Sequence, residues 1–313
     1  MKKLGLVPAH DGSLTAVANA SRIALAGPMV HSIELSVSDL VDDGEILGAF
    51  QRKSDARDAK VVVKRATGGG SVRSGAGVIH AVLALASPGA MVPATVDQLL
   101  NRYVRPFLAA MTKVAAPARY FGRDWISVDH RPSASVSFAH VASSGRTVIE
   151  VFVGADRSFA AGTRASHLGK EPIALNTLAK VPVTAERLRA ALVSELAERH
   201  GLESVELSVP VIAPAPPLPE DPPWTAVLDD AIGPIGAGRD RAGSFRVGGE
   251  LMASTDAMTE LESRVATALL DGGADAVRQE IDAIVEGIFG APEVALFGAR
   301  TASIRDVIVA ALD

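Results

Sequence analysis

The chain of 313 residues is 48 % hydrophobic and 21 % charged, which suffices for one large globular domain and one small one. Its net charge of −5 excludes a strong overall attraction to nucleic acid or anionic membranes. The lack of cysteine excludes disulfides, cysteine-ligated metals and thiol nucleophiles, and no apolar run approaches the roughly 20 residues that span a bilayer. We therefore expect a cytoplasmic protein without nucleic-acid or membrane partners.

The first third of the chain shows helical and strand periodicities in alternation. Helices are expected at 13–26, where Ser13 can cap the first turn, and at 95–113, where Pro106 should kink or split the helix. Alternating or β-branched residues predict strands at 31–38, 46–50, 60–64 and 78–85.

The middle of the chain is dominated by strand-like segments. Three of these are expected at 125–129, 134–141 and 147–153, with a hairpin turn at Ser143-Ser144-Gly145 between the last two. A helix is expected at 184–200, between Thr184 as its cap and Gly201, and a further strand at 205–209.

The last third begins with a change of composition. Residues 210–223 contain seven prolines and read as an extended linker, and a glycine-rich stretch continues it to residue 244. Three helices are then expected at 256–271, 274–289 and 301–312. The predicted organisation is a mixed α/β domain at 1–209, a linker at 210–244 and a small helical accessory domain at 245–313.

A glycine-rich segment carries the main chemical signal, Lys64-Arg65-Ala66-Thr67-Gly68-Gly69-Gly70-Ser71-Val72. Three glycines let backbone N–H groups approach a ligand without Cβ atoms in the way, and consecutive amides can bind an anion. Arg65 adds a planar cation suited to carboxylate or phosphate. The spacing fits neither a P-loop nor a dinucleotide-binding fingerprint, and a plain glycine turn between two strands remains an equal alternative.

The segment from Lys64 to Gly77 resembles the lipoate-protein ligase family of the biotin and lipoate ligase superfamily. That family carries Arg-Arg-x-Ser/Thr-Gly-Gly-Gly-x-Val-x-His-x-x-Gly, and the register holds over all fourteen positions of this chain. Two other segments support the resemblance. Residues 46–51 are similar to an apolar-apolar-Gly-x-x-Gln strand, and Gly122-Arg123-Asp124 is similar to a Gly-Arg-Asn-Asp turn.

The resemblance implies a mixed-sheet α/β (α+β) fold of the biotin/lipoyl ligase type with a small C-terminal helical domain. It also implies activation of lipoate or octanoate by ATP and magnesium, followed by transfer of the acyl group to a lysine of a lipoyl carrier domain. Arg65 would face the phosphate or carboxylate. The ligand-binding residues that it implies are Arg65, Thr67, Gly68, Gly69, Gly70, Ser71, Gly122, Arg123 and Asp124.

Two positions depart from the family pattern. Its histidine is Ser74 here, and its lysine, which stabilises the adenylate, falls on or next to Pro132. Arg131 or Lys170 could supply the missing charge, so both are weak catalytic candidates. No cluster of His, Asp or Glu has the spacing of a metal site, and the lack of cysteine excludes the thioester route of the family's acyltransferases.

Two functions remain open. The intact glycine segment and Arg65 favour a ligase-like enzyme that binds a lipoate- or octanoate-type acid and its acyl-adenylate. The missing lysine and histidine favour a ligase-fold binding protein that has lost catalysis.

Overall fold

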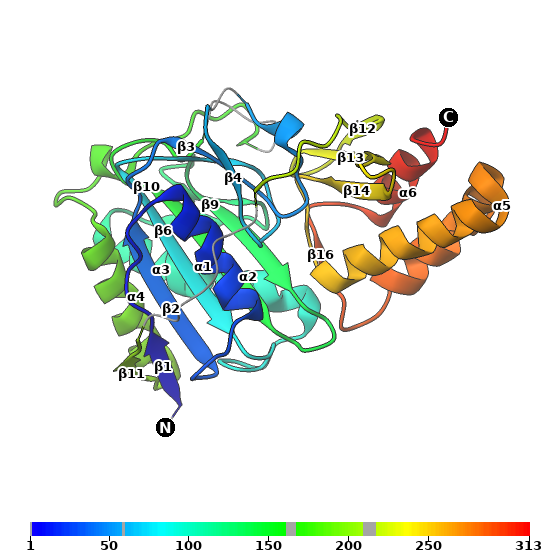
Figure 1. Ribbon diagram of the computed structural model, residues 1–313. Coiled ribbons are helices and arrows are strands. Elements are labelled where there is room, and N and C mark those ends of the chain that lie inside the picture. Colours follow the sequence, from blue (N-terminus) through cyan, green and yellow to red (C-terminus); the bar gives the residue numbers. More distant parts are fainter. Residues whose placement is uncertain (1, 58–59, 161–166, 209–216) are drawn as a thin grey trace.

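A large mixed sheet forms the centre of the computed structural model, which describes residues 2–57, 60–160, 167–208 and 217–313 (Figure 1). Strand β1 is parallel to both of its neighbours, and all other neighbouring strands of this sheet are antiparallel. The order across the sheet is β11 (Glu203–Glu206), β1 (Lys3–Leu6), β2 (Ile33–Asp39), β6 (Val78–Leu85), β10 (Thr147–Gly154), β9 (Arg131–His140), β8 (Trp125–Val128) and β7 (Ala118–Tyr120).

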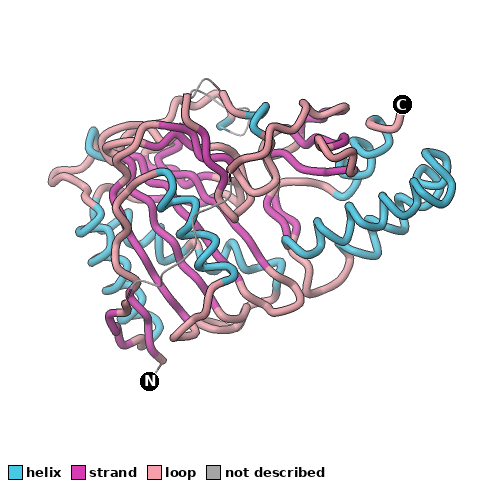
Figure 2. The backbone as a smooth tube through the Cα atoms, in the orientation of Figure 1, coloured by secondary structure: helices cyan, strands magenta, loops and turns pink. Residues whose placement is uncertain are grey.

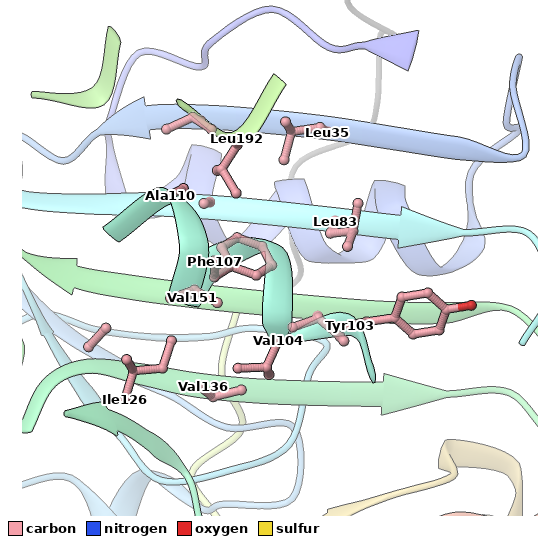
Figure 3. Packing of buried hydrophobic residues seen from close by; sticks show 14 of the residues in the cluster. Leu35, Leu83, Tyr103, Val104, Phe107, Ala110, Ile126, Val136, Val151 and Leu192 are labelled. Atoms are coloured by element: carbon pink, nitrogen blue, oxygen red, sulfur yellow. The ribbon is translucent and has the colours of Figure 1, made fainter. Parts of the chain in front are cut away.

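Helices cover both faces of this sheet. One face carries α1 (Leu14–Ala26), and the other carries α2 (Leu99–Tyr103), α3 (Arg105–Val114) and α4 (Ala185–His200). Figure 3 shows Phe107 of α3 packed over Val151 of β10, and Val104 packed over Val136 of β9. The low aromatic content fits this interface, because small and branched side chains let a helix approach a sheet closely.

The helix boundaries follow local chemistry. The Ser13 side chain accepts a hydrogen bond from the Ala16 N–H and caps α1, as predicted. The helix expected at 95–113 is split around Val104, two residues before Pro106, because proline lacks an N–H and clashes with the preceding turn. Gly201 ends α4 in a left-handed conformation with φ of 60°. Short 3₁₀ turns lie at Lys53–Asp55, Val96–Gln98 and Leu175–Thr177.

A second, smaller sheet lies on the same side of the large sheet as α1. It consists of β4 (Val62–Lys64), β3 (Gly44–Leu47) and β5 (Val72–Ser74), in that order. Its apolar side chains share a buried cluster with α1 and β10, formed by residues such as Leu14, Val17, Ile46, Val72 and Phe152. The segment between β4 and β5 is the glycine-rich loop.

The C-terminal part has its own hydrophobic core. A three-stranded sheet of β12 (Ala226–Asp229), β13 (Pro234–Arg239) and β14 (Phe245–Gly249) packs against α5 (Thr255–Phe289) and α6 (Thr301–Ala310). Gly273 breaks α5 with φ of 70° and ψ of −156°, and the two arms fold back on each other (Figure 2). These arms and α6 are the three helices expected from the sequence. A short ladder pairs β15 (Met252–Ala253) with β16 (Leu296–Phe297).

The linker expected at 210–244 was placed too long, because β12 and β13 lie within it. Glycines obscure the strand pattern there: a Cβ on Gly236 would clash with the ring of Trp224, and one on Gly238 with Thr225. The C-terminal unit is thus α/β and not helical alone, and its first strand begins at Ala226. In the described part of the chain, no helix is both long and apolar enough to cross a bilayer.

Candidate functional site at the glycine loop

The glycine loop lies where the large sheet meets the C-terminal unit. The Gly68 N–H donates to the Phe138 carbonyl of β9 at 2.8 Å, and the Phe138 N–H donates back at 3.4 Å. The next amide, that of Gly69, donates to the carbonyl of Leu251 at 2.7 Å. Two amides that could have bound an anion are therefore engaged by the protein itself.

Close backbone packing explains why this loop consists of glycine. A Cβ on Gly68 would clash with the Leu251 carbonyl, and a Cβ on Gly48 would clash with the Gly69 carbonyl. Gly69 itself has φ of 106°, which favours glycine. The glycines are needed to seat the loop between two neighbours, whether or not a ligand binds there.

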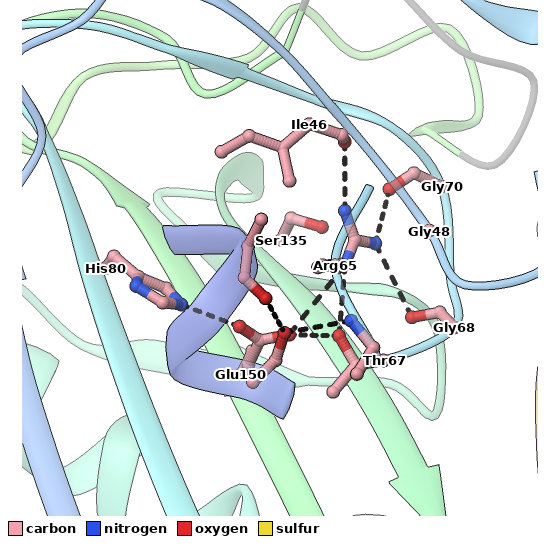
Figure 4. Close-up of polar contacts among 12 residues, drawn as sticks. Ile46, Gly48, Arg65, Thr67, Gly68, Gly70, His80, Ser135 and Glu150 are labelled. Atoms are coloured by element: carbon pink, nitrogen blue, oxygen red, sulfur yellow. Dashed lines mark hydrogen bonds and ion pairs between the residues drawn. The ribbon is translucent and has the colours of Figure 1, made fainter. Parts of the chain in front are cut away.

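The Arg65 side chain is fully buried beneath the loop (Figure 4). Its guanidinium donates to the carbonyls of Ile46 at 3.0 Å and Gly70 at 2.8 Å and to the Thr67 hydroxyl at 3.0 Å. The Glu150 carboxylate lies 3.9 Å from it and balances its charge. The guanidinium that was expected to face a ligand phosphate or carboxylate is thus directed into the core by these partners.

A chain of hydrogen bonds continues from Glu150 to the N-terminal segment. The Thr67 hydroxyl donates a hydrogen bond to one carboxylate oxygen of Glu150, and His80 Nε2 lies 2.8 Å from the other. His80 Nδ1 lies 3.0 Å from His10 Nε2, while His10 Nδ1 accepts the Gly12 N–H at 3.1 Å.

The Gly12 amide determines the proton positions along this chain. Because His10 Nδ1 is an acceptor, its Nε2 carries the proton and donates to His80 Nδ1. His80 Nε2 then donates to Glu150. Burial lowers the pKa of His10 to about 3, so His10 is neutral. Every bond in the chain points toward one carboxylate, that of Glu150.

The turn at Gly122-Arg123-Asp124 joins β7 to β8 and reaches the same strand as the glycine loop. The Asp124 carbonyl accepts the Val136 N–H at 2.8 Å and the Ser135 hydroxyl at 3.4 Å. The Asp124 side chain is buried, and Arg123 extends outward to the Ala231 carbonyl at 3.3 Å. Strand β9 therefore brings together the two segments that were singled out in the sequence.

Serines line the face of β9 that points toward α1. Register pairs Ser135 with Phe152 and Ser137 with Glu150, so these side chains share one face of the sheet. The hydroxyls of Ser137 and Ser74 are buried and have no hydrogen-bond partner among the residues that the structure describes. Buried hydroxyls are normally paired, so unpaired ones mark places that suit a polar ligand or water.

Comparison with known proteins identifies this architecture. No protein-family profile matches the chain, and no curated protein matches it in sequence. Among solved structures, the bipartite lipoate protein ligase of Thermoplasma acidophilum superposes with a TM-score of 0.54 at 13 % identity, covering 67 % of this chain and 88 % of that one. A lipoate-protein ligase A bound with ATP gives 0.51 at 14 % identity, covering 67 % and 90 %.

The chain has the lipoate-protein ligase fold. A structure of the Thermoplasma protein Ta0514 with bound lipoic acid superposes equally, with a TM-score of 0.52 at 14 % identity over 67 % of this chain and 90 % of that one. The fold class and the family likeness expected from the glycine segment are thus confirmed.

Within the lipoate-protein ligase fold, one candidate cation, Arg131, is the first residue of β9. Arg131 donates to the carbonyls of Glu171 at 2.9 Å and Pro172 at 3.3 Å, the two residues that follow the other candidate, Lys170. Pro132 is buried, and its carbonyl accepts the Ile173 N–H at 2.8 Å. Arg131 therefore holds the 171–173 segment in place, and Lys170 lies on the turn before it.

Three residues of the site, the buried Glu150 and His80 and the half-buried His10, were not singled out in the sequence. Glu150 is the single acid in the apolar strand β10, and His80 interrupts the apolar strand β6. A lone ionisable side chain in an apolar strand needs a buried partner, and that was the available signal. The partner itself could not be found in the sequence, because His10, His80 and Glu150 are about 70 residues apart.

Proposed function

We propose that this protein is a non-catalytic binding protein with the lipoate-protein ligase fold, which holds a lipoate- or octanoate-type acyl group without activating it with ATP. The observation that carries this proposal is the burial of Arg65. Its guanidinium is occupied by Glu150, Thr67 and two carbonyls of the loop region, so it does not face a ligand phosphate.

Adenylation needs positive charge, because a carboxylate must approach a triphosphate. At the glycine loop the N–H groups of Gly68 and Gly69 already donate to backbone carbonyls of the protein, and the positive charge of Arg65 is balanced by Glu150. On or next to the position expected for the lysine stands Pro132, which has neither charge nor N–H. These residues do not fit ATP and magnesium.

Binding of an acyl group has different requirements. The buried hydroxyls of Ser74 and Ser137 could donate to a neutral carbonyl, which would satisfy them without adding charge to the core. We therefore infer that the preferred ligand is a neutral acyl derivative, such as the amide on a carrier lysine, and not a free acid. A lipoyl carrier domain is the corresponding candidate partner, and a cytoplasmic location would place the protein with it.

The second candidate function is the ligase reaction itself. It is favoured by Arg131 at the start of β9, which bonds to the residue after Lys170, and by neighbours of the same fold that bind ATP or lipoic acid. Arg131 differs from a lysine in reach and geometry, and its hydrogen bonds to Glu171 and Pro172 would have to break before it could serve a substrate.

Pyrophosphate exchange with ATP, driven by lipoate or octanoate, distinguishes the two functions. We expect exchange at least about 10²-fold slower than that of an active lipoate-protein ligase assayed in parallel. Exchange at ligase rates would reject the binding-protein proposal. The variants Arg131→Ala and Lys170→Ala, made separately, would then identify the residue that replaces the lysine.

Ligand binding is tested separately by native mass spectrometry of the purified protein. Titration with octanoate, with octanamide and with an octanoylated carrier domain should give the tightest complex with one of the two neutral amides. Preference for the free acid would contradict the assignment of a neutral ligand.

A further inference from the structure

A groove of about 330 Å³ lies between α1, strand β4 and the extended segment 217–219. Its helix wall is a stripe formed by Thr15, Ala18 and Arg22, which are three and four residues apart and so share one face of α1. None of the described residues that line the groove belongs to the large sheet. The groove is therefore a feature of the small sheet and the helix that packs on it.

The helix and the strand run in the same direction along this groove. Near their starts, Gly44 lies against both the Leu14 side chain and the Val61 carbonyl. Near their ends, the Ala66 N–H donates to the Ser21 hydroxyl at 2.8 Å. The C-terminal ends of α1 and β4 therefore lie side by side, and residues at those ends meet at one end of the groove.

Two cations stand at that end, Arg22 on the helix and Lys64 on the strand. The Arg22 guanidinium donates to the Asn19 side chain at 3.1 Å, and it forms no ion pair with a residue that the structure describes. The Lys64 ammonium has neither a hydrogen bond nor an ion pair within the described ranges. Burial lowers the pKa of Lys64, as expected for a cation removed from water without a partner.

The surroundings do not compensate these two charges. No aspartate or glutamate is among the described lining residues, and the charge of Arg65, which also lines the groove, is balanced by Glu150. Three carboxylates attract Lys64 from beyond the groove, and each already accepts a hydrogen bond from another group. They are Asp55, Asp221 and Glu262, whose donors are the Trp224 indole, the Arg241 backbone N–H and the Arg246 guanidinium.

The rest of the groove is largely apolar. Ala18 of the helix faces Val62 and Val63 of β4, and the segment 217–219 adds two prolines and a leucine. An apolar cavity of about 150 Å³ already holds a benzene molecule, so this groove has room for a compact anionic head and a chain of about six carbons. A doubly cationic end and an apolar body together match an amphipathic anion.

We propose that this groove binds an alkyl phosphomonoester, with its phosphate on Arg22 and Lys64 and its alkyl chain along α1 and the valines of β4. A phosphomonoester carries a charge of about −1.5 to −2 at pH 7, which compensates both cations, whereas a carboxylate or a sulfate ester carries only one charge. The planar guanidinium binds two phosphate oxygens at once, and the ammonium adds a point charge. This ligand class differs from the neutral acyl derivative proposed for the glycine loop.

Titration of the isotope-labelled full-length protein with four ligands tests the site. We expect hexyl phosphate to shift the backbone amide resonances of Thr15, Ala18 and Val63 in a saturable manner. Hexyl sulfate has the same shape with one charge, hexanoate has one charge on a smaller head, and methyl phosphate lacks the chain, so all three should bind more weakly. Equal binding of hexyl sulfate and hexyl phosphate, or shifts centred on Ser135 and Ser137 of β9, would overturn the proposal.

Four variants separate charge from space. Lys64→Gln and Arg22→Gln should each weaken hexyl phosphate binding about tenfold or more. Thr15→Phe should fill the apolar end, which weakens hexyl phosphate and leaves methyl phosphate unchanged. Lys3→Gln removes the same charge from an exposed position of β1 and, as the matched control, should change neither. Unchanged affinity for hexyl phosphate in folded Lys64→Gln and Arg22→Gln proteins would refute the role of the two cations.

Discussion

At the scale of single residues, Glu150 determines how the glycine loop is held. It is fully buried, and it receives the Thr67 hydroxyl on one side and His80 on the other. A buried carboxylate is tolerated when it is paired and hydrogen-bonded, and Arg65 together with these donors meets that condition. The loop motif and the N-terminal segment are thus parts of one buried polar network.

The neutral His10 at the other end of this network predicts a pH dependence of stability. Its pKa is about 3 in the folded protein, below the value of 6.5 for an unperturbed histidine, so the unfolded chain binds one more proton between those values. Stability from this group is complete above about pH 6.5 and is lost as the pH falls toward 3. The expected slope is up to about 1.4 kcal/mol per pH unit.

Urea unfolding of the native protein and of His10→Gln at several pH values measures this contribution. The variant retains a donor and an acceptor but does not titrate, so its free energy of unfolding should decline less steeply between about pH 4 and about pH 6. The carboxylates of the protein titrate in both proteins, so their contributions to the pH dependence cancel in the comparison. Equal slopes would mean that His10 is not held neutral by the fold.

At the scale of elements, β9 is the strand on which the separate motifs meet. The glycine loop pairs with it at Phe138, the turn before β8 bonds to it at Val136, and the C-terminal unit bonds to the loop through Leu251. The loop therefore lies at a junction of β9, the turn before β8 and the C-terminal unit, and its glycines permit the close backbone contacts of that junction. The neighbouring strand β4, which leads into the loop, is only half-buried.

The junction predicts unequal effects of alanine at two glycines. Gly68→Ala places a methyl group against the Leu251 carbonyl and should lower the free energy of unfolding by about 2 kcal/mol. Gly89→Ala introduces a methyl group where no other atom lies within 4 Å, and should change stability by less than about 0.5 kcal/mol. Urea unfolding of both variants is the measurement. Equal stabilities would show that the loop can move away from Leu251 without cost.

At the scale of the whole molecule, two hydrophobic cores are joined at a shared seam. The C-terminal sheet and helices enclose one core, while Met252 and Ile232 of that unit insert into the core of the large sheet. In return, Phe50 of the large domain packs against the C-terminal core. At the same seam, the Arg52 guanidinium stacks on the Trp224 ring at 3.6 Å. Separate cores favour separate unfolding, and the seam opposes it.

The two tryptophans allow the cores to be observed individually. Trp224→Phe leaves Trp125 as the probe of the large sheet, and Trp125→Phe leaves Trp224 as the probe of the C-terminal unit. We expect the Trp224 signal to change at lower urea concentration, because the smaller core buries less apolar surface. Coincident transitions, with circular dichroism as the common reference for both variants, would show a single cooperative unit and reject the two-domain proposal.

The sequence by itself determined most of the local structure. Caps, glycines and prolines act within a few residues, so the boundaries of α1, α4 and the two arms of α5 could be predicted from them. The fourteen-residue register of the glycine segment likewise indicated the fold before any coordinates. Where glycines stand against Trp224 and Thr225, the strand pattern was hidden and the linker was placed too long.

Only the tertiary structure decided what the motif residues face. Arg65 looked like a ligand-binding cation because its neighbours in sequence are glycines, but its actual partner Glu150 lies 85 positions away and on another sheet. The N–H groups of Gly68 and Gly69 likewise donate to the carbonyls of Phe138 and Leu251. Charge pairing and amide bonding across such distances depend on how the sheets and the C-terminal unit pack, and no local pattern of residues encodes that packing.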